Sequence, residues 1–438
     1  MGEKTAKEKI HEFDRFGSVL GLERMLVLLE KLGNPQNGLS VIHVAGTNGK
    51  GSVSRFIYEG LQANDYKVGL FSSPFITCFN ERIQFDGHMI SDHELDQYTK
   101  RVLEKVDLMI KEGKDSPTEF EVVTAIALLY FAEMKSDFVI LEVGLGGRGD
   151  STNVVEKPLI SIITSISYDH MDKLGNTLGE IAGEKAGIIK ENVPVVSGVE
   201  SEEARKVIAK VAYEKGARLY DATKIPYKIT RADMNGAVVD MEINETGYGD
   251  VAISMGGEHQ VKNLRTALTA IEIMRKKGQV KVERAKLYQG IKNSVLPGRF
   301  EVMGGNPYYI LDGAHNQAGA KALKDAMKTY FPQAKILLVV GMLADKQVDE
   351  ILAELVEITD QVIVTEPDNP RKLPMKSLEE KFNKLGANTT IASGAKAACA
   401  AARNYQKSRD VILFSGSLYL IGQIREMLKD EKESNIIL

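Results

Sequence analysis

The sequence has little of what marks secreted, membrane-bound or nucleic-acid-binding proteins. Only two cysteines, Cys78 and Cys399, occur among its 438 residues, which argues against a disulfide framework and favours a cytoplasmic protein. The formal net charge is -4 and no basic run occurs, so nothing indicates a nucleic-acid partner. No apolar run is long enough to cross a bilayer, and the opening residues are charged rather than signal-like. We therefore expect no membrane partner.

What the chain does contain is the composition of a globular protein with more than one core. Hydrophobic residues make up 43% and charged residues 26% of the sequence, which is typical of a soluble protein. A chain of this length exceeds one ordinary domain. Strand-like and helix-like segments alternate along most of it, and this pattern predicts an α/β fold with parallel sheets.

A glycine-rich loop within residues 41–54, VIHVAGTNGKGSVS, organises the first half of the chain. It joins an apolar strand-like stretch to a helical pattern, which is the layout of a phosphate-binding loop. Lys50 adds a mobile cation, and Ser52 supplies a hydroxyl where such loops hold Mg²⁺. The spacing lacks the common G-x-x-x-x-G-K-[ST] form. The alternative is a glycine-rich turn whose lysine is merely on the surface.

Polar side chains follow two apolar strands further along. Residues 138–141 form a run typical of a strand buried on both faces, and Glu142 stands at its end. A buried carboxylate needs a cation, so Glu142 is either a metal ligand or half of a buried salt bridge. His170 follows the strand predicted at 159–166, so both side chains can reach the same sheet edge, where ligands bind. A lone histidine such as His170 can equally be structural.

Three further groups have both a structural and a functional interpretation. Lys185, in a helix predicted at 177–190, is by default a surface charge or a phosphate contact, and could bind a metal only as a carbamate. Thr118 and Glu121 have the spacing of a helix capping box, which explains them without a ligand. Residues 80–82, Asn-Glu-Arg, read equally well as a salt bridge within a solvated loop.

The remaining pattern predicts the domain organisation. We expect a helix at 18–32, a long irregular passage at 73–92, and an antiparallel appendage at 226–256, where the patterning has a period of two. Residues 1–296 are predicted to form a first domain, which carries the glycine-rich loop, and 297–300 a linker. Residues 301–438 are predicted to form a second, smaller Rossmann-like α/β domain. Its strands also end in polar loops, which contain Asp312, His315 and Ser417; the alternative for His315 is part of a helix-start cap cluster.

Several segments, taken in order, resemble one enzyme family. They are HVAGTNGKGS, SSPFITCFNERI, TEFE, LEVGLGGRGDSTNV, SYDHMDKLGNTLGEIAGEKAGIIK, PGRF, LDGAHN and GSLYL. Together they resemble the folylpolyglutamate synthase and dihydrofolate synthase family, a branch of the Mur ligase superfamily of ATP-dependent amide-forming enzymes. The short spacing of the glycine loop is that superfamily's form, and no guanine-reading N-K-x-D motif is evident.

The resemblance implies a reaction and its ligands. ATP would phosphorylate a folate-side carboxylate, and the amino group of L-glutamate would displace phosphate to form an amide, with the protein acting by positioning and charge neutralisation. The implied ATP contacts are Asn48, Gly49, Lys50, Gly51, Ser52, Asn263, Arg299 and Asp312. Two Mg²⁺ ions are implied, one on Ser52 and Glu142 and one on Glu142, His170 and carbamylated Lys185. The implied catalytic set is Lys50, Glu142, His170, Lys185, Asp312 and His315.

The resemblance also implies where the other substrates bind. The implied substrate contacts are Gly21, Leu22, Glu23, Ser73, Phe75, Arg82, Thr118, Glu119, Phe120, Glu121, Asp150, His315 and Ser417. Residues 72–75 (SSPF) and 150–153 (DSTN) resemble forms found in synthases that only extend the glutamate chain. Residues 21–24 (GLER) resemble the dihydropteroate segment of bifunctional members. We expect polyglutamylation of tetrahydrofolate, with dihydrofolate synthesis left open.

Two other functions are compatible with the loop. A ligase of cell-wall precursor synthesis would share the loop, Mg²⁺ and lysine, but would need a preceding domain for a UDP-sugar, and only about forty residues precede the loop. A nucleotide-gated binding module without chemistry would switch between two states but release no ADP in response to glutamate. A monomer is the expectation from the family.

Overall fold

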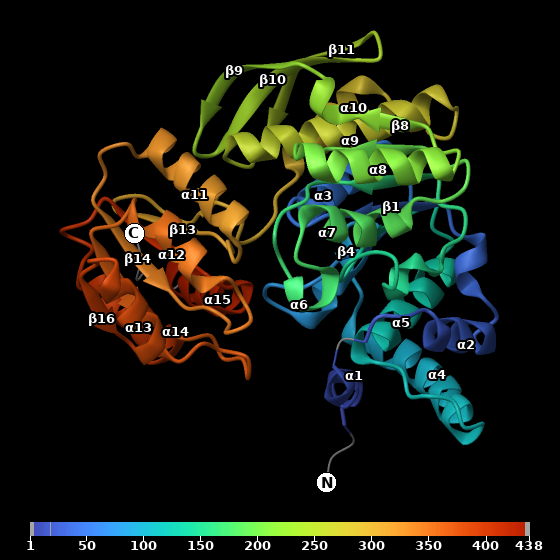
Figure 1. Cartoon of the computed structure of the whole chain (residues 1–438), viewed down its shortest axis with the longest axis horizontal. Helices are drawn as coiled ribbons and strands as arrows, with labels where there is room; N and C mark the ends of the chain where they lie inside the picture. Colours follow the sequence, from blue (N-terminus) through green and yellow to red (C-terminus); the bar gives the residue numbers. More distant parts are fainter. Residues whose placement is uncertain (1–3, 18, 434–438) are drawn as a thin grey trace.

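The computed structural model describes residues 4–17 and 19–433, whose strands form three sheets (Figure 1). The first sheet has the order β4-β3-β2-β5-β1-β6-β7-β8, in which β3 and β4 are antiparallel additions at one edge. Its strands are β1 (Val41–Ala45), β2 (Val68–Phe71), β3 (Ile83–Phe85), β4 (His88–Met89), β5 (Phe138–Glu142), β6 (Ile160–Ile163), β7 (Val195–Ser197) and β8 (Leu219–Asp221). The glycine-rich loop therefore leaves the centre of this sheet.

Helices cover both faces of the first sheet, because its central parallel strands are apolar on both sides. One face packs against α3 (Lys50–Gln62), α9 (Glu258–Lys276) and α10 (Arg284–Asn293). The other face packs against α1 (Ala6–His11), α2 (Glu23–Lys31), α4 (Asp92–Lys111), α5 (Glu119–Glu133), α7 (Leu178–Lys185) and α8 (Glu202–Glu214). A short helix, α6 (Met171–Leu174), follows the loop after β6. Helix α5 is apolar around most of its circumference, and most of its side chains are accordingly buried.

The second sheet is the antiparallel appendage, built from β9 (Tyr227–Asp233), β10 (Gly236–Ile243) and β11 (Thr246–Ile253). It lies against α9 and α10 at the top of the view in Figure 1. Buried Val239, Met241 and Tyr248 extend the main core onto its inner face, while nearly all of β9 is exposed.

The third sheet has the order β12-β13-β17-β14-β15-β16, parallel apart from β12. Its strands are β12 (Glu301–Val302), β13 (Tyr308–Leu311), β14 (Ile336–Val340), β15 (Gln361–Val364), β16 (Thr389–Ile391) and β17 (Val411–Ser415). The covering helices are α11 (Gln317–Tyr330), α12 (Val348–Val356) and α13 (Met375–Lys384) on one face, and α14 (Gly394–Arg403) and α15 (Leu418–Glu433) on the other. This unit lies beside the first sheet in Figure 1.

The predicted fold class is confirmed: two α/β units with a small antiparallel appendage. The domain limits at 297–300 stay a prediction. In the part of the chain that the structure describes, every strand of the first sheet precedes residue 297 and every strand of the third sheet follows residue 300. Two expectations were wrong in detail. The helix predicted from residue 18 begins at Glu23, because Gly21 has a φ of +141° that a helix does not allow. The passage predicted as irregular at 73–92 contains a 3₁₀ turn (Phe79–Arg82) and the strands β3 and β4.

Both cysteines are free thiols in different surroundings. Cys78 is half-buried at the start of the 3₁₀ turn, with its Sγ 3.7 Å from the Sδ of Met89. Cys399 is buried in α14, and burial raises its pKa to about 11. Among the described helices, none is both long and apolar enough to cross a bilayer.

Candidate active site

The glycine-rich loop leaves β1 between the ends of its two neighbours, β5 and β6. Val44 is paired with Glu142 of β5 and with Ile162 of β6, so the polar residues that follow all three strands meet at one edge. Gly49 has a φ of +83°, and a Cβ there would lie 2.3 Å from the Asn263 side-chain oxygen. Only glycine allows this approach, which places Asn263 directly against the loop.

The loop satisfies its own polar groups in this structure. The Lys50 ammonium donates to the carbonyl oxygens of Gly46 (3.1 Å) and Thr47 (3.3 Å). The side-chain amides of Asn48 and Asn316 exchange two hydrogen bonds, of 3.1 and 3.0 Å. Ser52 is buried in the first turn of α3. A cation, a buried hydroxyl and the N-terminus of a helix are thus gathered in one place, an arrangement that suits phosphate.

Glu142 lies beside this loop without a basic partner. A Cβ at Gly51 would be 3.7 Å from its Oε2 atom, and no Lys, Arg or His of the described residues forms an ion pair with it. Burial raises the pKa of Glu142 to about 7, although Lys50, Arg299 and the Ser73 amide all act to lower it. The predicted alternative, a buried salt bridge, is therefore wrong, and the carboxylate fits a site that receives a cation.

Lys185 is buried at the end of α7 rather than exposed, so its default interpretation as a surface charge is wrong. Its Nζ donates to the carbonyl oxygen of Gly46 at 2.9 Å. Burial, with a smaller contribution from the Lys50 charge, lowers its pKa to about 7. A substantial neutral fraction at neutral pH follows, and a neutral amine can react with CO₂.

His170 faces the second unit across the same edge. The ring lies 3.4 Å from the Lys346 ammonium, and Lys346 donates to Asp169 at 2.8 Å. Burial, Lys346 and, more weakly, Lys50 and Lys185 lower the pKa of His170 to about 4, despite the opposing effect of Asp169. Its imidazole is thus neutral, the form that binds metals. Its pairing with Glu142 stays a prediction.

Asp312 and His315 come from the loop after β13, and His315 faces Asp169 of the first unit. Asp312 is buried and accepts from the amides of Phe300 and Ala314, both at 2.8 Å. Burial raises its pKa, and Arg299 counteracts part of this rise. His315 Nδ1–H donates to the carbonyl oxygen of Gly313 (2.7 Å), and its Nε2 lies 3.8 Å from Asp169 Oδ2.

The cap of α11 is Asn316, not His315. Its Oδ1 accepts from the Gly319 amide at 2.9 Å. The helix-start cap cluster is thus confirmed for the loop, with Asn316 as the cap and His315 directly before it. Ser417, at the start of α15, is buried, and its Oγ has no hydrogen-bond partner. An unpartnered buried hydroxyl is expected to acquire a partner when a polar ligand binds.

The predicted folate-side residues form a separate aromatic and charged cluster. The Arg82 guanidinium lies 5.8 Å from the Phe75 ring centre and 5.2 Å from that of Phe79, within cation–π range. It donates to Glu119 at 3.0 Å, and Glu119 also contacts His11 of α1 at 3.0 Å. The salt bridge predicted within residues 80–82 is wrong, because Arg82 pairs with α5 instead.

The capping box at the start of α5 is confirmed. Thr118 accepts from the Glu121 amide, and Glu121 accepts from the Thr118 amide at 2.7 Å. Glu121 also accepts from Arg24 at 3.1 Å. Phe120 lies against Gly144, where a Cβ would be 2.4 Å from its ring. The box therefore has a structural role whether or not it meets a ligand.

Two predicted substrate segments lie close to each other. The Gly21 amide donates to Gly149 O at 2.9 Å, just before Leu22 and Glu23 begin α2. Asp150 directly follows Gly149 in the loop after β5 and is buried. It accepts from the amides of Leu145 (2.8 Å) and Thr152 (3.0 Å). Its carboxylate therefore organises its own loop in this structure.

Comparison with known proteins decides the family. The Mur ligase middle domain matches residues 44–271, and the Mur ligase glutamate ligase domain matches residues 298–418. The chain is 40% identical over 430 residues, 97% of this chain and 99% of the relative, to a Bacillus subtilis protein named dihydrofolate synthase/folylpolyglutamate synthase. The chain belongs to the folylpolyglutamate synthase and dihydrofolate synthase family of Mur ligases. The resemblance identified from its motifs is thereby confirmed.

Solved structures of this family are similar along the whole chain. A Thermotoga maritima folylpolyglutamate synthase gives a TM-score of 0.85 at 37% identity, covering 97% of both chains. A Mycobacterium tuberculosis folylpolyglutamate synthase complexed with ADP and AMPPCP gives a TM-score of 0.90 at 30% identity, covering 97% of this chain and 98% of that one. An Escherichia coli relative complexed with DHPP and ADP gives a TM-score of 0.86 at 30% identity, covering 98% and 99%.

Sequence reasoning missed several polar residues in this Mur ligase. Asn316, Asp169 and Lys346 form contacts between the two units, while Arg24 and His11 reach the capping box and Glu119. The signal for Lys346 was available, because it follows β14 at the same sheet edge as Asp312 follows β13. The partners of Arg24 and His11 lie about a hundred residues away, and no local pattern indicates them.

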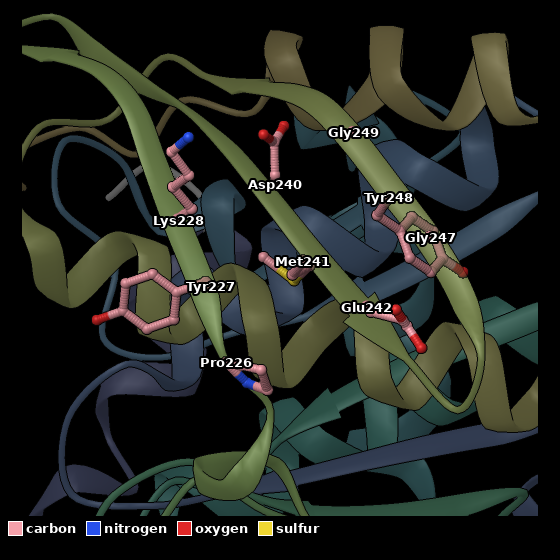
Figure 2. Close-up of a pocket in the computed structure, with 9 residues that line it drawn as sticks. All are labelled: Pro226, Tyr227, Lys228, Asp240, Met241, Glu242, Gly247, Tyr248 and Gly249. Carbon is pink, nitrogen blue, oxygen red and sulfur yellow. The ribbon is translucent and has the colours of Figure 1, made fainter.

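A shallow recess on the appendage is separate from these residues (Figure 2). It is lined by Pro226, Tyr227, Lys228, Asp240, Met241, Glu242, Gly247, Tyr248 and Gly249. None of the predicted site residues lines it. Among the described residues no three His, Cys, Asp or Glu side chains gather as a ready metal site.

Proposed function

We propose that this ligase adds L-glutamate to a tetrahydrofolate through an acyl phosphate formed with ATP. The observation that carries the proposal is the meeting of the Lys50 loop, an unpaired buried Glu142 and a buried Lys185 at the ends of β1, β5 and α7. Phosphoryl transfer needs charge neutralisation more than a protein nucleophile. The relatives named above, in complex with ADP or AMPPCP, support ATP as the nucleotide.

ATP is proposed to lie between the loop and the second unit. Asn48, Gly49, Lys50, Gly51 and Ser52 would hold its phosphates, and Asn263, Arg299 and Asp312 the rest of the nucleotide. Lys50 would exchange its bonds to Gly46 and Thr47 for phosphate oxygens. Asn48 would release Asn316 in the same way. Binding is therefore an exchange of hydrogen bonds within a preformed loop.

The residues present fit Mg²⁺. Ser52 and Glu142 would hold one ion with phosphate oxygens, and Glu142, His170 and a carbamate on Lys185 a second. When bound, the ions would neutralise the phosphate charge. The Lys185 carbamate would form when its neutral amine attacks the carbon of CO₂, with loss of one proton from nitrogen. The unpaired carboxylate of Glu142 supports this assignment.

The binding sites for L-glutamate and for the folate are assigned from the positions of the residues. His315, Asp312 and Ser417 are proposed to hold the incoming glutamate, with the unpartnered Ser417 hydroxyl as one donor. The folate is proposed to lie near Ser73, Phe75 and Arg82, where the rings and the guanidinium offer stacking and charge. The remaining proposed contacts are Gly21, Leu22, Glu23, Thr118, Glu119, Phe120, Glu121 and Asp150.

Dihydropteroate is a second candidate acceptor. Relatives from Bacillus subtilis and Escherichia coli carry both activities in their names, whereas one from Lacticaseibacillus casei, 33% identical over 423 residues, is named folylpolyglutamate synthase alone. Residues 21–24 favour the bifunctional form and residues 72–75 the other.

The test incubates the protein with ATP, Mg²⁺, L-glutamate and either tetrahydrofolate or dihydropteroate, and determines product masses. We expect glutamate adducts on tetrahydrofolate. Adducts on dihydropteroate would establish dihydrofolate synthesis as well. Adducts on tetrahydrofolate alone would exclude dihydrofolate synthesis. A nucleotide-gated binding module would give no glutamate-dependent ADP release, and that result would overturn the ligase proposal.

A division at residues 297–300, a monomeric state and a cytoplasmic location are proposed together with the ligase function.

A further inference from the structure

A buried histidine in the central strand has no role in the function proposed above. His43 lies in the middle of β1 and is fully buried. Its Nε2 lies 2.9 Å from the Thr152 hydroxyl, and its Nδ1 is buried with no hydrogen-bond partner. An unpartnered buried nitrogen costs free energy that an aliphatic side chain at this position would avoid.

The direction of the hydrogen bonds along this chain of residues can be assigned. The Thr152 hydroxyl donates to Asp150 Oδ1 at 2.5 Å, and the Asp150 oxygens also accept from the amides of Leu145 and Thr152. Since a hydroxyl has one proton, Thr152 must accept from His43 Nε2–H. Nε2 therefore carries a proton, and burial, assisted by the Lys190 charge, lowers the pKa of the imidazole to about 3, so the ring is neutral with an unprotonated Nδ1.

This chain of hydrogen bonds ends at the loop between β5 and Thr152. Asp150 holds the Leu145 amide, three residues after Glu142. Between these anchors, Gly147 lies against α7: a Cβ there would be 3.0 Å from the Lys185 Cα and 2.9 Å from its carbonyl oxygen. The loop thus forms part of the wall that fixes the Lys185 backbone. A displaced loop would displace Lys185.

We propose that His43 is a positioning residue: through Thr152 and Asp150 it holds the loop of residues 143–150 and thereby the Lys185 backbone. The catalytic consequence rests on the proposed function, in which Lys185 binds Mg²⁺ as a carbamate, whereas the effect on the loop does not. His43 touches no substrate in this scheme. Its effect reaches the reaction only through two intervening residues.

The test compares variants that break the chain with variants that preserve it. His43→Leu removes the donor, and His43→Gln places an amide N–H where Nε2–H was. Thr152→Val breaks the same link with little change in shape. Thr99→Val is the matched control, because Thr99 on α4 is equally buried and its hydroxyl has no partner. Amide hydrogen exchange of residues 143–150 is measured without substrates, and kcat and KM in the ligase assay.

We expect His43→Leu and Thr152→Val to speed exchange of residues 143–150 about tenfold, while His43→Gln and Thr99→Val leave it near the wild-type rate. In the assay, the first two variants should lower kcat roughly tenfold to a hundredfold with KM for ATP unchanged, since small displacements of a reacting group have effects of this size. The double variant His43→Leu/Thr152→Val should lose no more kcat than either single variant, because both substitutions break the same link.

Unchanged exchange in a folded Thr152→Val protein would overturn the proposal, as would an equal loss of kcat in His43→Gln and His43→Leu. If wild-type protein makes no product, the proposed function fails, while the exchange experiment still decides the role of His43. If His43→Leu does not fold, Thr152→Val carries both measurements.

Discussion

The amino group of Lys185 is buried at the end of α7, and this burial changes its protonation. Its pKa is lowered to about 7, chiefly by burial, so a neutral amine is available for carbamate formation near neutral pH. We predict that Lys185→Ala abolishes ligase turnover and that short carboxylic acids, which can occupy the place of the carbamate, restore part of it. Steady-state rates with and without added acetate check this. Lys190→Ala is the control, which acetate should not affect; unchanged turnover in Lys185→Ala would refute the metal-ligand role.

His43 is one of several histidines whose pKa is lowered by burial, which makes the fold sensitive to acid, and its pKa is lowered furthest. Burial lowers its pKa to about 3, well below the ordinary histidine value of about 6.5, so below about pH 6.5 the folded protein keeps this imidazole neutral while the unfolded chain takes up a proton. The stability from this group is complete above about pH 6.5 and is lost as the pH falls toward 3. We predict that His43→Gln makes the free energy of unfolding less dependent on pH, by up to about 1.4 kcal/mol per unit between about pH 4 and 6. Urea titrations check this, with exposed His93→Gln as control; equal slopes for His43→Gln and wild type would contradict it.

At the scale of elements, one buried carboxylate on α9 attaches the antiparallel appendage. Glu272 is fully buried and accepts from Tyr248 (2.8 Å), Thr246 (2.7 Å) and Arg275 (2.8 Å). We predict that Glu272→Ala lowers the free energy of unfolding by about 2 kcal/mol, because it leaves the hydroxyl of buried Tyr248 without its acceptor and removes the bonds to Thr246 and Arg275. Glu202→Ala, which removes an exposed i,i+4 pair on α8, should cost less than about 0.5 kcal/mol. Denaturant titrations compare the two, and equal losses would argue against the anchoring role.

Long elements with a strong period were predictable, and short ones were not. Strand β5 and helix α5 follow from their apolar runs and the Thr118–Glu121 box. Strands β3, β4, β12 and β16 are two or three residues long, too short for a period, and they exist because a neighbouring strand offers them hydrogen bonds. The position of Glu142 at the sheet edge was predictable once β5 was, because Glu142 ends that apolar run. In a parallel sheet the ends of neighbouring strands lie together.

At the scale of the whole molecule, a buried ion pair joins the two units. Lys346 and Asp169 lie 2.8 Å apart, and their side chains are 8% and 9% exposed. We predict that Lys346→Met, which leaves Asp169 without this partner, separates the units and raises the radius of gyration of the ligand-free protein. Small-angle scattering measures this. Lys381→Met, which breaks an exposed pair within the second unit, is the control, and an unchanged radius in Lys346→Met would contradict the prediction.

Such contacts between units mark the limit of what sequence reasoning reached. Each half of the site was predictable, because polar loops follow apolar strands in both units. The pairing of Asn48 with Asn316 joins residues 268 positions apart, and it depends on how two complete folds meet. No local spacing encodes that orientation, which is why the pairing of Asp169 with Lys346 was missed even though Lys346 follows a strand at the same sheet edge as Asp312.

The contrast between the two thiols has a practical consequence. Cys399 is shielded in α14 with its pKa raised to about 11, whereas Cys78 is half-exposed at the turn that carries Arg82. A maleimide dye added under mild conditions would therefore attach at one place without any engineering. The dye would lie beside the folate site proposed around Arg82, so we expect its fluorescence to change when the pterin-bearing substrate binds, without any substitution in the chain.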